Sequence, residues 1–302
     1  MSNHPQFTVL FPAFSGALRE PDPEFHREQR VLEELNIPFH VVNIEALIQG
    51  NFEKALWAIH PSGPSKVIYR GCILHPAEYS ELDRGLRKVG LHLFISPSEY
   101  EAALLFPRWY PLVQEHAIPA TWIFGSDPRE ALRAAQVLSP PPYFIKDFSK
   151  SAKEIVPRGC IVKGADIEHK MATSIRQLLD YRASRFEGGI VIRPLVKLRY
   201  LADNPFGGEL FEEYRLFFFE GELIASTGYD RIVGNVKTLE DFSFLAMKID
   251  SRFFTADIVV TADGAQRILE IGDGGSSALP PLLDVAAFYL KIIEKVSRCT
   301  GC

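Results

Sequence analysis

Two carboxylates, Asp257 and Glu270, stand on either side of a strong turn signal near the end of the chain. The signal is Asp263-Gly264, and the arms around it are rich in residues that favour strands. Counting back along both arms from a turn centred there puts Asp257 directly opposite Glu270. Like charges so placed repel each other unless a cation lies between them, and Mg²⁺ prefers oxygen ligands. The pattern indicates a magnesium site, and a hairpin whose carboxylates face water is the alternative.

Lysines gather at the end of another expected strand. Lys146 ends the apolar run 143–146, and the loop that follows carries Lys150 and Lys153 beside two serines. Ammonium groups on a flexible loop can clamp the phosphates of a nucleotide. A solvated basic loop is the alternative interpretation.

A third candidate is the junction between an apolar strand and an extended linker. The strand 188–193 ends in Arg193 and runs into Pro194, Leu195 and Val196. Pro194 offers only its carbonyl, whereas Val196 keeps both its N–H and its C=O. These groups could bind an adenine ring, and a plain connection between domains is the alternative.

Two arginines stand at the ends of strands. Arg215 begins an apolar run, and Arg70 follows the expected strand 66–69. Ligands of open α/β sheets lie outside the carboxyl ends of strands, and guanidinium forks suit carboxylates. We predict that Arg70 binds a substrate carboxylate. The alternative is a structural ion pair with Glu78 or Asp83.

The elements that must position these residues follow two rhythms. The first 125 residues alternate strands with helices, which predicts a small parallel sheet: strands at 7–11, 39–43, 66–69 and 91–95, and helices at 23–35 and 78–89. A helix begins at Asp127-Pro128, a capping residue followed by proline at the first helical position. Antiparallel hairpins dominate after that helix: strands at 143–146, 159–163 and 190–193, a helix at 173–183, turns at Glu220-Gly221 and Asp263-Gly264, and a last helix at 281–297. The predicted fold class is therefore α/β followed by α+β.

Composition narrows the function classes. The 302 residues are 47% hydrophobic and 24% charged, which fits about two globular domains. A net charge of −5 without basic blocks argues against nucleic-acid binding. The start of the chain has no signal-peptide pattern, and charges interrupt the last helix, so no membrane span is expected. We expect a soluble cytoplasmic protein, either a monomer or a homodimer.

In their order and spacing these pieces resemble the ATP-grasp superfamily of carboxylate–amine ligases, over roughly residues 126 to 302. The matching features are the strand lysine, a loop at 148–154 in place of the glycine-rich flap, the strand-to-linker junction and the metal hairpin. The chain looks most like a divergent, poorly characterised bacterial and phage clade. Its members share a Tyr-Arg-Gly strand end, here 69–71, an arginine at the hinge and a Glu-x-Gly-Asp-Gly ending, here 270–274.

The resemblance implies a domain plan and a reaction. Residues 1–125 would form a small α/β domain, and residues 126–302 an ATP-grasp domain with a small lobe at about 140–193 and a large lobe at about 194–302. A substrate carboxylate would attack the γ-phosphate of ATP to give an acyl phosphate and ADP, and an amine would then displace phosphate. The implied site consists of Mg²⁺ on Asp257, Glu270 and Asp273, phosphates at Lys146, Lys150, Lys153 and Arg215, and adenine along Arg193, Pro194, Leu195 and Val196.

Two departures from the family pattern matter for activity. Most ATP-grasp ligases have a glutamate where this chain has Arg193, and arginine cannot accept a hydrogen bond from adenine. Gly272 stands where the family has a metal-binding asparagine, so Asp273 is the expected replacement. A nucleotide-binding pseudo-ligase without chemistry is therefore the alternative. A nucleic-acid ligase or nucleotidyltransferase is disfavoured, because Lys146 does not stand in a Lys-x-Asp-Gly motif.

Overall fold

The structure is a computed structural model that describes residues 6–60, 65–150, 160–203, 209–228, 239 and 241–299. The chain divides into two compact units and passes between them four times. Unit 1 comprises residues 1–102, 214–255 and 272–302, and unit 2 comprises residues 103–213 and 256–271. This division differs from the domain plan above, because the expected large lobe contributes to both units.

Unit 1 begins with the parallel sheet that the sequence predicts. Strand β1 pairs in parallel with β3 and β4, β4 pairs in parallel with β5, and β2 adds an antiparallel edge that the sequence did not indicate. The strands are β1 (Thr8–Phe14), β2 (Ala17–Pro21), β3 (Phe39–Val42), β4 (Lys66–Tyr69) and β5 (His92–Leu93). The accompanying helices are η1 (Pro23–Phe25), α1 (His26–Glu34), α2 (Ile44–Ile48), α3 (Phe52–Leu56), α4 (Pro76–Lys88) and α5 (Pro97–Leu104).

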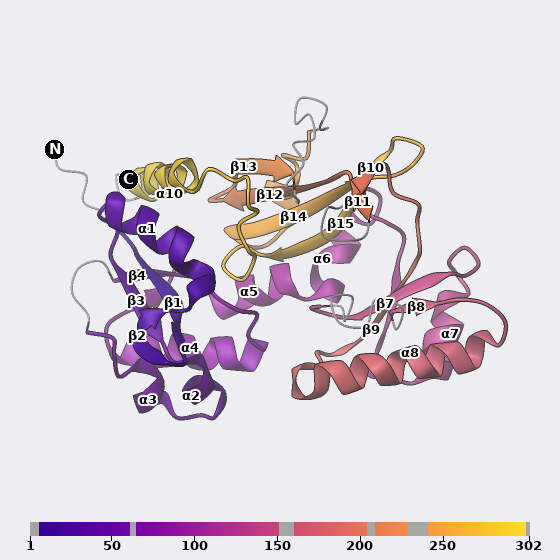
Figure 1. Cartoon of the computed structure of the whole chain (residues 1–302), viewed down its shortest axis with the longest axis horizontal. Coiled ribbons are helices and arrows are strands. Elements are labelled where there is room, and N and C mark those ends of the chain that lie inside the picture. Colours follow the sequence, from indigo (N-terminus) through magenta and orange to yellow (C-terminus); the bar gives the residue numbers. More distant parts are fainter. Residues whose placement is uncertain are drawn as a thin grey trace. The chain divides into compact units, whose positions relative to one another are not determined.

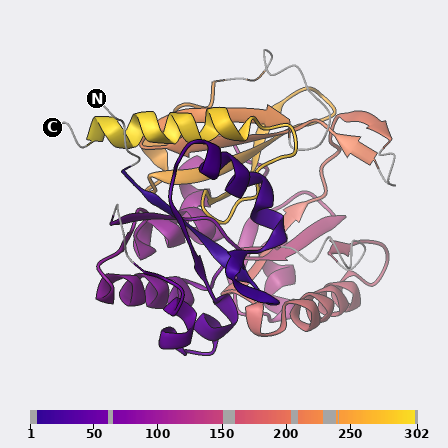
Figure 2. The same ribbon diagram turned by 60° about the vertical axis from the view of Figure 1, so that its left-hand side comes forward.

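A second sheet has the strand order β13-β12-β14-β15. Its turn at Glu220-Gly221 is confirmed, since both residues have positive φ, as a tight turn between antiparallel strands requires. The boundary between the units passes within β14 and β15. Helix α10 lies beside α1, as Figure 2 shows in yellow and indigo. These elements are β12 (Glu213–Phe219), β13 (Glu222–Gly228), α9 (Leu245–Lys248), β14 (Phe253–Val260), β15 (Gln266–Asp273) and α10 (Val285–Cys299).

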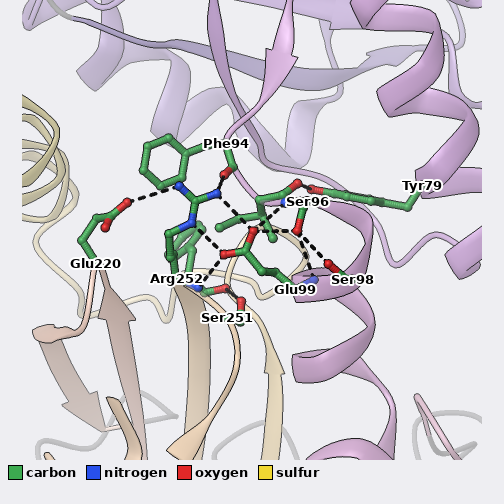
Figure 3. A network of polar contacts seen from close by, with 10 residues as sticks. Tyr79, Phe94, Ser96, Ser98, Glu99, Glu220, Ser251 and Arg252 are labelled. Carbon is green, nitrogen blue, oxygen red and sulfur yellow. Dashed lines mark hydrogen bonds and ion pairs between the residues drawn. The ribbon is translucent and has the colours of Figure 1, made fainter. Parts of the chain in front are cut away.

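Within unit 1, an arginine connects the second sheet to the N-terminal region (Figure 3). Arg252 Nε donates to Glu99 Oε1 at 2.7 Å, and its guanidinium lies 4.9 Å from the centre of the Phe94 ring. Glu99 in turn accepts the N–H of Ser96 at 2.9 Å, which caps the start of α5. One side chain therefore fixes α5 against the start of β14.

Unit 2 is built on the antiparallel sheet β6-β9-β7-β8 (Figure 1). One face of this sheet packs against α7 and α8 in a core that includes Tyr143, Ile145, Ile190 and Ile192. The capping role predicted for Asp127 is confirmed, because its carboxylate accepts the N–H of Arg129 at 2.7 Å. The elements are α6 (Phe106–Val113), β6 (Thr121–Phe124), α7 (Pro128–Ala135), β7 (Tyr143–Asp147), β8 (Ile161–Val162), α8 (Ile167–Arg182), η2 (Ala183–Arg185), β9 (Gly189–Pro194), β10 (Tyr200–Asp203) and β11 (Glu209–Phe211).

Strand β6 explains why unit 2 begins earlier than residue 126. It pairs antiparallel with β9, from Thr121 opposite Ile192 to Phe124 opposite Gly189. Sequence reasoning left this strand out because its partner lies in a distant part of the chain. In the described part of the chain, no helix is both long and apolar enough to cross a membrane.

The close pairing of β6 and β9 predicts that Gly189 tolerates no side chain. A Cβ atom there would lie 2.0 Å from the carbonyl oxygen of Ile123, and backbone cannot yield as a side chain can. Gly189→Ala should lower the free energy of unfolding by about 1–3 kcal/mol, measured by denaturant unfolding. In the control Gly85→Ala, the new Cβ meets only the flexible end of Leu56. That loss should be smaller, because alanine favours a helix by about 1 kcal/mol; equal losses would contradict the prediction.

Candidate active site

Lys146 and Arg193 share one face of the unit 2 sheet. Lys146 on β7 pairs with Val191 on β9, and Phe144 pairs with Arg193. Cross-strand partners lie on the same side of a sheet, and neighbouring residues alternate between its faces. Lys146 and Arg193 are therefore on the face opposite to Ile145, which belongs to the core with α7 and α8.

The ammonium of Lys146 forms an ion pair with Glu270. Lys146 is only 4% exposed, and its Nζ donates to Glu270 Oε1 from a strand 124 residues away in sequence. A buried ammonium is costly unless it is paired, so this contact fixes both side chains. The structure thus brings together a predicted phosphate lysine and a predicted metal carboxylate within unit 2.

Arg193 is the second cation beside Glu270. Its Nη1 donates to the carbonyl of Leu269 at 3.2 Å, and its guanidinium lies 4.7 Å from the centre of the Phe144 ring. Burial lowers the pKa of this guanidinium, and the charges of Glu270 and Glu213 act in the opposite direction. The hinge arginine is therefore engaged with the strand that carries Glu270.

The metal hairpin turns differently from the sequence prediction. The N–H of Gly264 donates to Thr261 O at 2.8 Å, and the N–H of Thr261 donates to Ala265 O at 2.9 Å. The loop therefore has three residues and ends in Gly264 with φ +92°, a conformation that glycine adopts readily. The prediction of a two-residue turn is wrong, and the count from it no longer sets Asp257 opposite Glu270. Both residues remain on the two strands of the hairpin, and Asp257 is buried.

The third predicted carboxylate, Asp273, has contacts of its own in unit 1. Its Oδ2 accepts the N–H of Ser276 at 2.7 Å, and burial raises the pKa of its carboxyl group to about 7. Gly272 leaves little room for the family's asparagine, because a Cβ atom there would lie 3.2 Å from Thr255 Oγ1 and 3.3 Å from Ser277 Oγ.

Among the residues that the structure describes, no three His, Cys, Asp or Glu side chains gather closely enough to hold a metal ion. The predicted set of three carboxylates is therefore not formed. Magnesium is commonly bound through only one or two carboxylates together with substrate phosphates. Asp257 and Glu270 fit that requirement as oxygen donors.

Sequence reasoning missed the residue that shapes the loop after Lys146. The buried carboxylate of Asp147 accepts the N–H groups of Ser149 at 2.8 Å and Lys150 at 2.6 Å. Arg182 Nε donates to its other oxygen at 2.6 Å. An aspartate two residues before a serine favours such a turn, and this signal was available in the sequence. Lys150 thus starts from a fixed backbone, whereas Lys153 lies outside the described residues.

The linker after β9 has the backbone groups expected of an adenine site. The N–H of Leu195 donates to Pro142 O at 2.8 Å, and Pro194 has no N–H to offer. Val196 makes no backbone hydrogen bond to another described residue. Val196 is therefore the residue of this linker best able to pair with a planar ring.

Arg70 does not offer its fork to a substrate, so our prediction for it was wrong. Arg70 is 1% exposed, and its Nε and Nη2 donate to the two carboxylate oxygens of Glu28 at 2.8 and 2.9 Å. Helix α1 supplies this partner, not the nearby Glu78 or Asp83. Arg215 is also buried, and its Nη1 donates to Ala278 O at 3.0 Å within unit 1.

Comparison with known proteins agrees with this arrangement. A family model described as an ATP-grasp domain, the third family of its clade, matches residues 135–292. The D-alanine–D-alanine ligase from Coxiella burnetii has a similar structure, with a TM-score of 0.61 and 11% identity, covering 98% of this chain and 99% of that one. No sequence match was found among curated proteins.

Two further solved structures are similar at comparable levels. A RimK domain ATP-grasp protein from Sphaerobacter thermophilus has a TM-score of 0.56 and 12% identity, over 95% of this chain and 99% of that one. The ATP-grasp ligase PsnB, solved with a minimal precursor, has a TM-score of 0.54 and 13% identity, over 97% and 99%. PsnB was also solved with the precursor, Mg and ADP. At these identities the likeness shows the fold.

The raised pKa of Asp273 predicts a specific pH dependence of stability. The folded carboxyl keeps its proton up to about pH 7, whereas an unfolded aspartate loses it near pH 3.9, so its contribution to stability falls as pH rises between these values. Asp273→Asn removes the titration and mimics the protonated form. The stability of the native chain relative to this variant should fall by up to about 1.4 kcal/mol per pH unit in that window. Denaturant unfolding at pH 5 and pH 8 measures it, and a pH-independent difference would contradict the assignment.

Proposed function

The chain belongs to the ATP-grasp domain family whose model it matches, and on that premise we propose that it joins a carboxylate to an amine through an acyl phosphate. The family and the fold support an ATP-dependent ligase. The observation that carries the proposal is the ion pair of Lys146 with Glu270, with Arg193 bound to the adjacent residue. This arrangement joins a candidate phosphate lysine to a candidate metal carboxylate.

The nucleotide would use the residues around this ion pair. Lys146 and Lys150 are placed to receive phosphates, and Lys153 and Arg215 are proposed to assist them. The adenine ring would lie along Arg193, Pro194, Leu195 and Val196. Since Arg193 binds Leu269 O, the adenine hydrogen bonds would come from the Pro194 carbonyl and the Val196 backbone.

Asp257 and Glu270 would hold Mg²⁺, with phosphate oxygens completing its coordination. The ion, when bound, would supply charge neutralisation at the transferring phosphoryl group. Glu270 would then be balanced by the metal, which releases the Lys146 ammonium to a phosphate oxygen. The residues of the ion pair would thus exchange partners when nucleotide binds.

The proposed reaction has two displacement steps. An oxygen of the substrate carboxylate attacks the γ-phosphorus, and the bond to the bridging oxygen breaks to release ADP. The amine nitrogen then attacks the acyl carbon, loses a proton, and inorganic phosphate leaves. Structural neighbours are named as a D-alanine–D-alanine ligase and as a ligase complexed with a precursor, so amino acids and peptides both belong in a substrate screen.

A pseudo-ligase that binds ATP without chemistry is the second candidate. Two observations favour it: Arg193 replaces the hinge acceptor, and Gly272 leaves no side chain at the position of the family's metal-binding asparagine. Such a protein would bind ATP and release no ADP with any mixture of acids. One assay therefore separates the two candidates.

The decisive experiment traps the acyl phosphate. The protein is incubated with Mg-ATP, pooled amino acids, peptides and hydroxylamine, and ADP and hydroxamates are detected by mass. Glu270→Gln should abolish both products, because the neutral side chain loses its attraction for the cation. Glu168→Gln, at an exposed ion pair with Arg129, is the matched control and should retain turnover. Full activity in Glu270→Gln would exclude the metal assignment.

Lys146→Met should weaken nucleotide binding. The methionine keeps the apolar stem but cannot replace an ammonium–phosphate contact in a desolvated site, so the Kd for ATP should rise about tenfold or more. Calorimetric titration measures this Kd. Lys170→Met, at an exposed position on α8, should leave it unchanged. Equal affinities in both variants would place the phosphates elsewhere.

A further inference from the structure

The guanidinium of Arg70 holds a loop rather than a substrate. We define the post-β15 loop as residues 274–278, which follow directly after β15. Arg70 Nη1 donates to the carbonyls of Gly274 at 2.6 Å, Ser277 at 2.8 Å and Gly275 at 3.2 Å. Three carbonyl oxygens of one short loop thus converge on a single nitrogen.

The arginine is itself held from behind. Glu28 binds the Nε and Nη2 edge with both carboxylate oxygens, and the same carboxylate accepts the hydroxyl of Tyr289 at 2.6 Å. Because α1 carries Glu28 and α10 carries Tyr289, two helices fix the direction of Nη1. The guanidinium plane therefore has one orientation, and the loop must conform to it.

The backbone of the loop approaches the end of β4 so closely that only glycine fits. The N–H of Gly71 donates to Gly275 O at 3.0 Å, and a Cβ atom on Gly275 would lie 2.4 Å from Tyr69 O. At the start of the loop, Gly274 N–H donates to Phe253 O at 3.1 Å. The loop occupies the carboxyl end of a parallel strand, where open α/β sheets commonly bind a ligand.

The far end of the loop orients a second arginine. Ala278 O accepts from Arg215 Nη1 at 3.0 Å, and Arg215 is one of the cations proposed above for the phosphates. A buried ion pair such as Arg70–Glu28 is weak support for stability in itself, because desolvation offsets much of its attraction. Its geometric effect on a loop is the more specific consequence.

From these contacts we propose that Arg70 is a positioning residue for the ligase reaction. Supported by Glu28 and Tyr289, it sets the post-β15 loop, and through Ala278 it sets the direction of the Arg215 guanidinium. It acts without touching substrate. The role in turnover depends on the proposed function, whereas the role in fixing the loop does not.

The test begins with Arg70→Lys, which keeps the charge but loses the fork, and Tyr289→Phe, which removes only the hydroxyl behind Glu28. Amide hydrogen exchange of residues 272–280 should rise strongly in Arg70→Lys and more weakly in Tyr289→Phe, with exchange in α4 and in β7 unchanged. Arg27→Lys is the matched control, since Arg27 also donates to backbone carbonyls, at Pro280 and Leu283, but not to this loop. If the loop exchanges no faster in Arg70→Lys than in Arg27→Lys, the proposal is wrong.

The kinetic arm uses the ADP-release assay with an acid found active in the screen. Arg70→Lys should lower kcat about 10- to 100-fold, the effect expected of a misplaced group, and leave the KM for the acid within about twofold. A raised KM for the acid with unchanged loop exchange would make Arg70 a substrate ligand and overturn the proposal. Faster exchange throughout unit 1 would reduce Arg70 to a general stabilising residue and overturn it equally. If the native protein releases no ADP at all, the proposed function fails, and the exchange measurement still decides whether Arg70 fixes the loop.

Discussion

The buried ammonium of Lys146 is the constraint on which unit 2 depends. A charge that is 4% exposed must be paired, and Glu270 is the partner that the fold supplies. The strand of Glu270 is therefore fixed on several sides, since Arg193 binds Leu269 O and the backbone of Ile268 bonds to His116 and Ile118. The position of the candidate metal carboxylate follows from these contacts and not from its hairpin alone.

Unit 1 uses arginine in a different way. Arg70 and Arg252 each combine a carboxylate partner with backbone carbonyls, at Gly274 and Phe94 respectively. A guanidinium has five donors in a plane, so one side chain can satisfy a carboxylate and still orient a loop. This explains why an arginine at a strand end did not mark a substrate site, although the position is a common one for ligands.

The departures from the family pattern have local structural reasons. Arg193 replaces an acceptor, and its guanidinium is engaged by the Leu269 carbonyl and the Phe144 ring. Gly272 replaces an asparagine at a place that the hydroxyls of Thr255 and Ser277 crowd. Both substitutions fit the packing around them, so they are compatible with a site that has been rebuilt as well as with one that has lost its chemistry.

The sequence by itself determined the features set by local physics. Period-two strands, the Asp127 cap and the Glu220-Gly221 turn depend on neighbours a few residues away, and each was found where the pattern placed it. Tertiary structure decided the rest. The pairing of β6 with β9, the choice of Glu28 as partner of Arg70 and the meeting of Lys146 with Glu270 all join residues distant in the chain. The turn at Gly264 shows the limit, because a single extra residue in a loop changes which side chains face each other, and only the closed hydrogen bonds reveal that count.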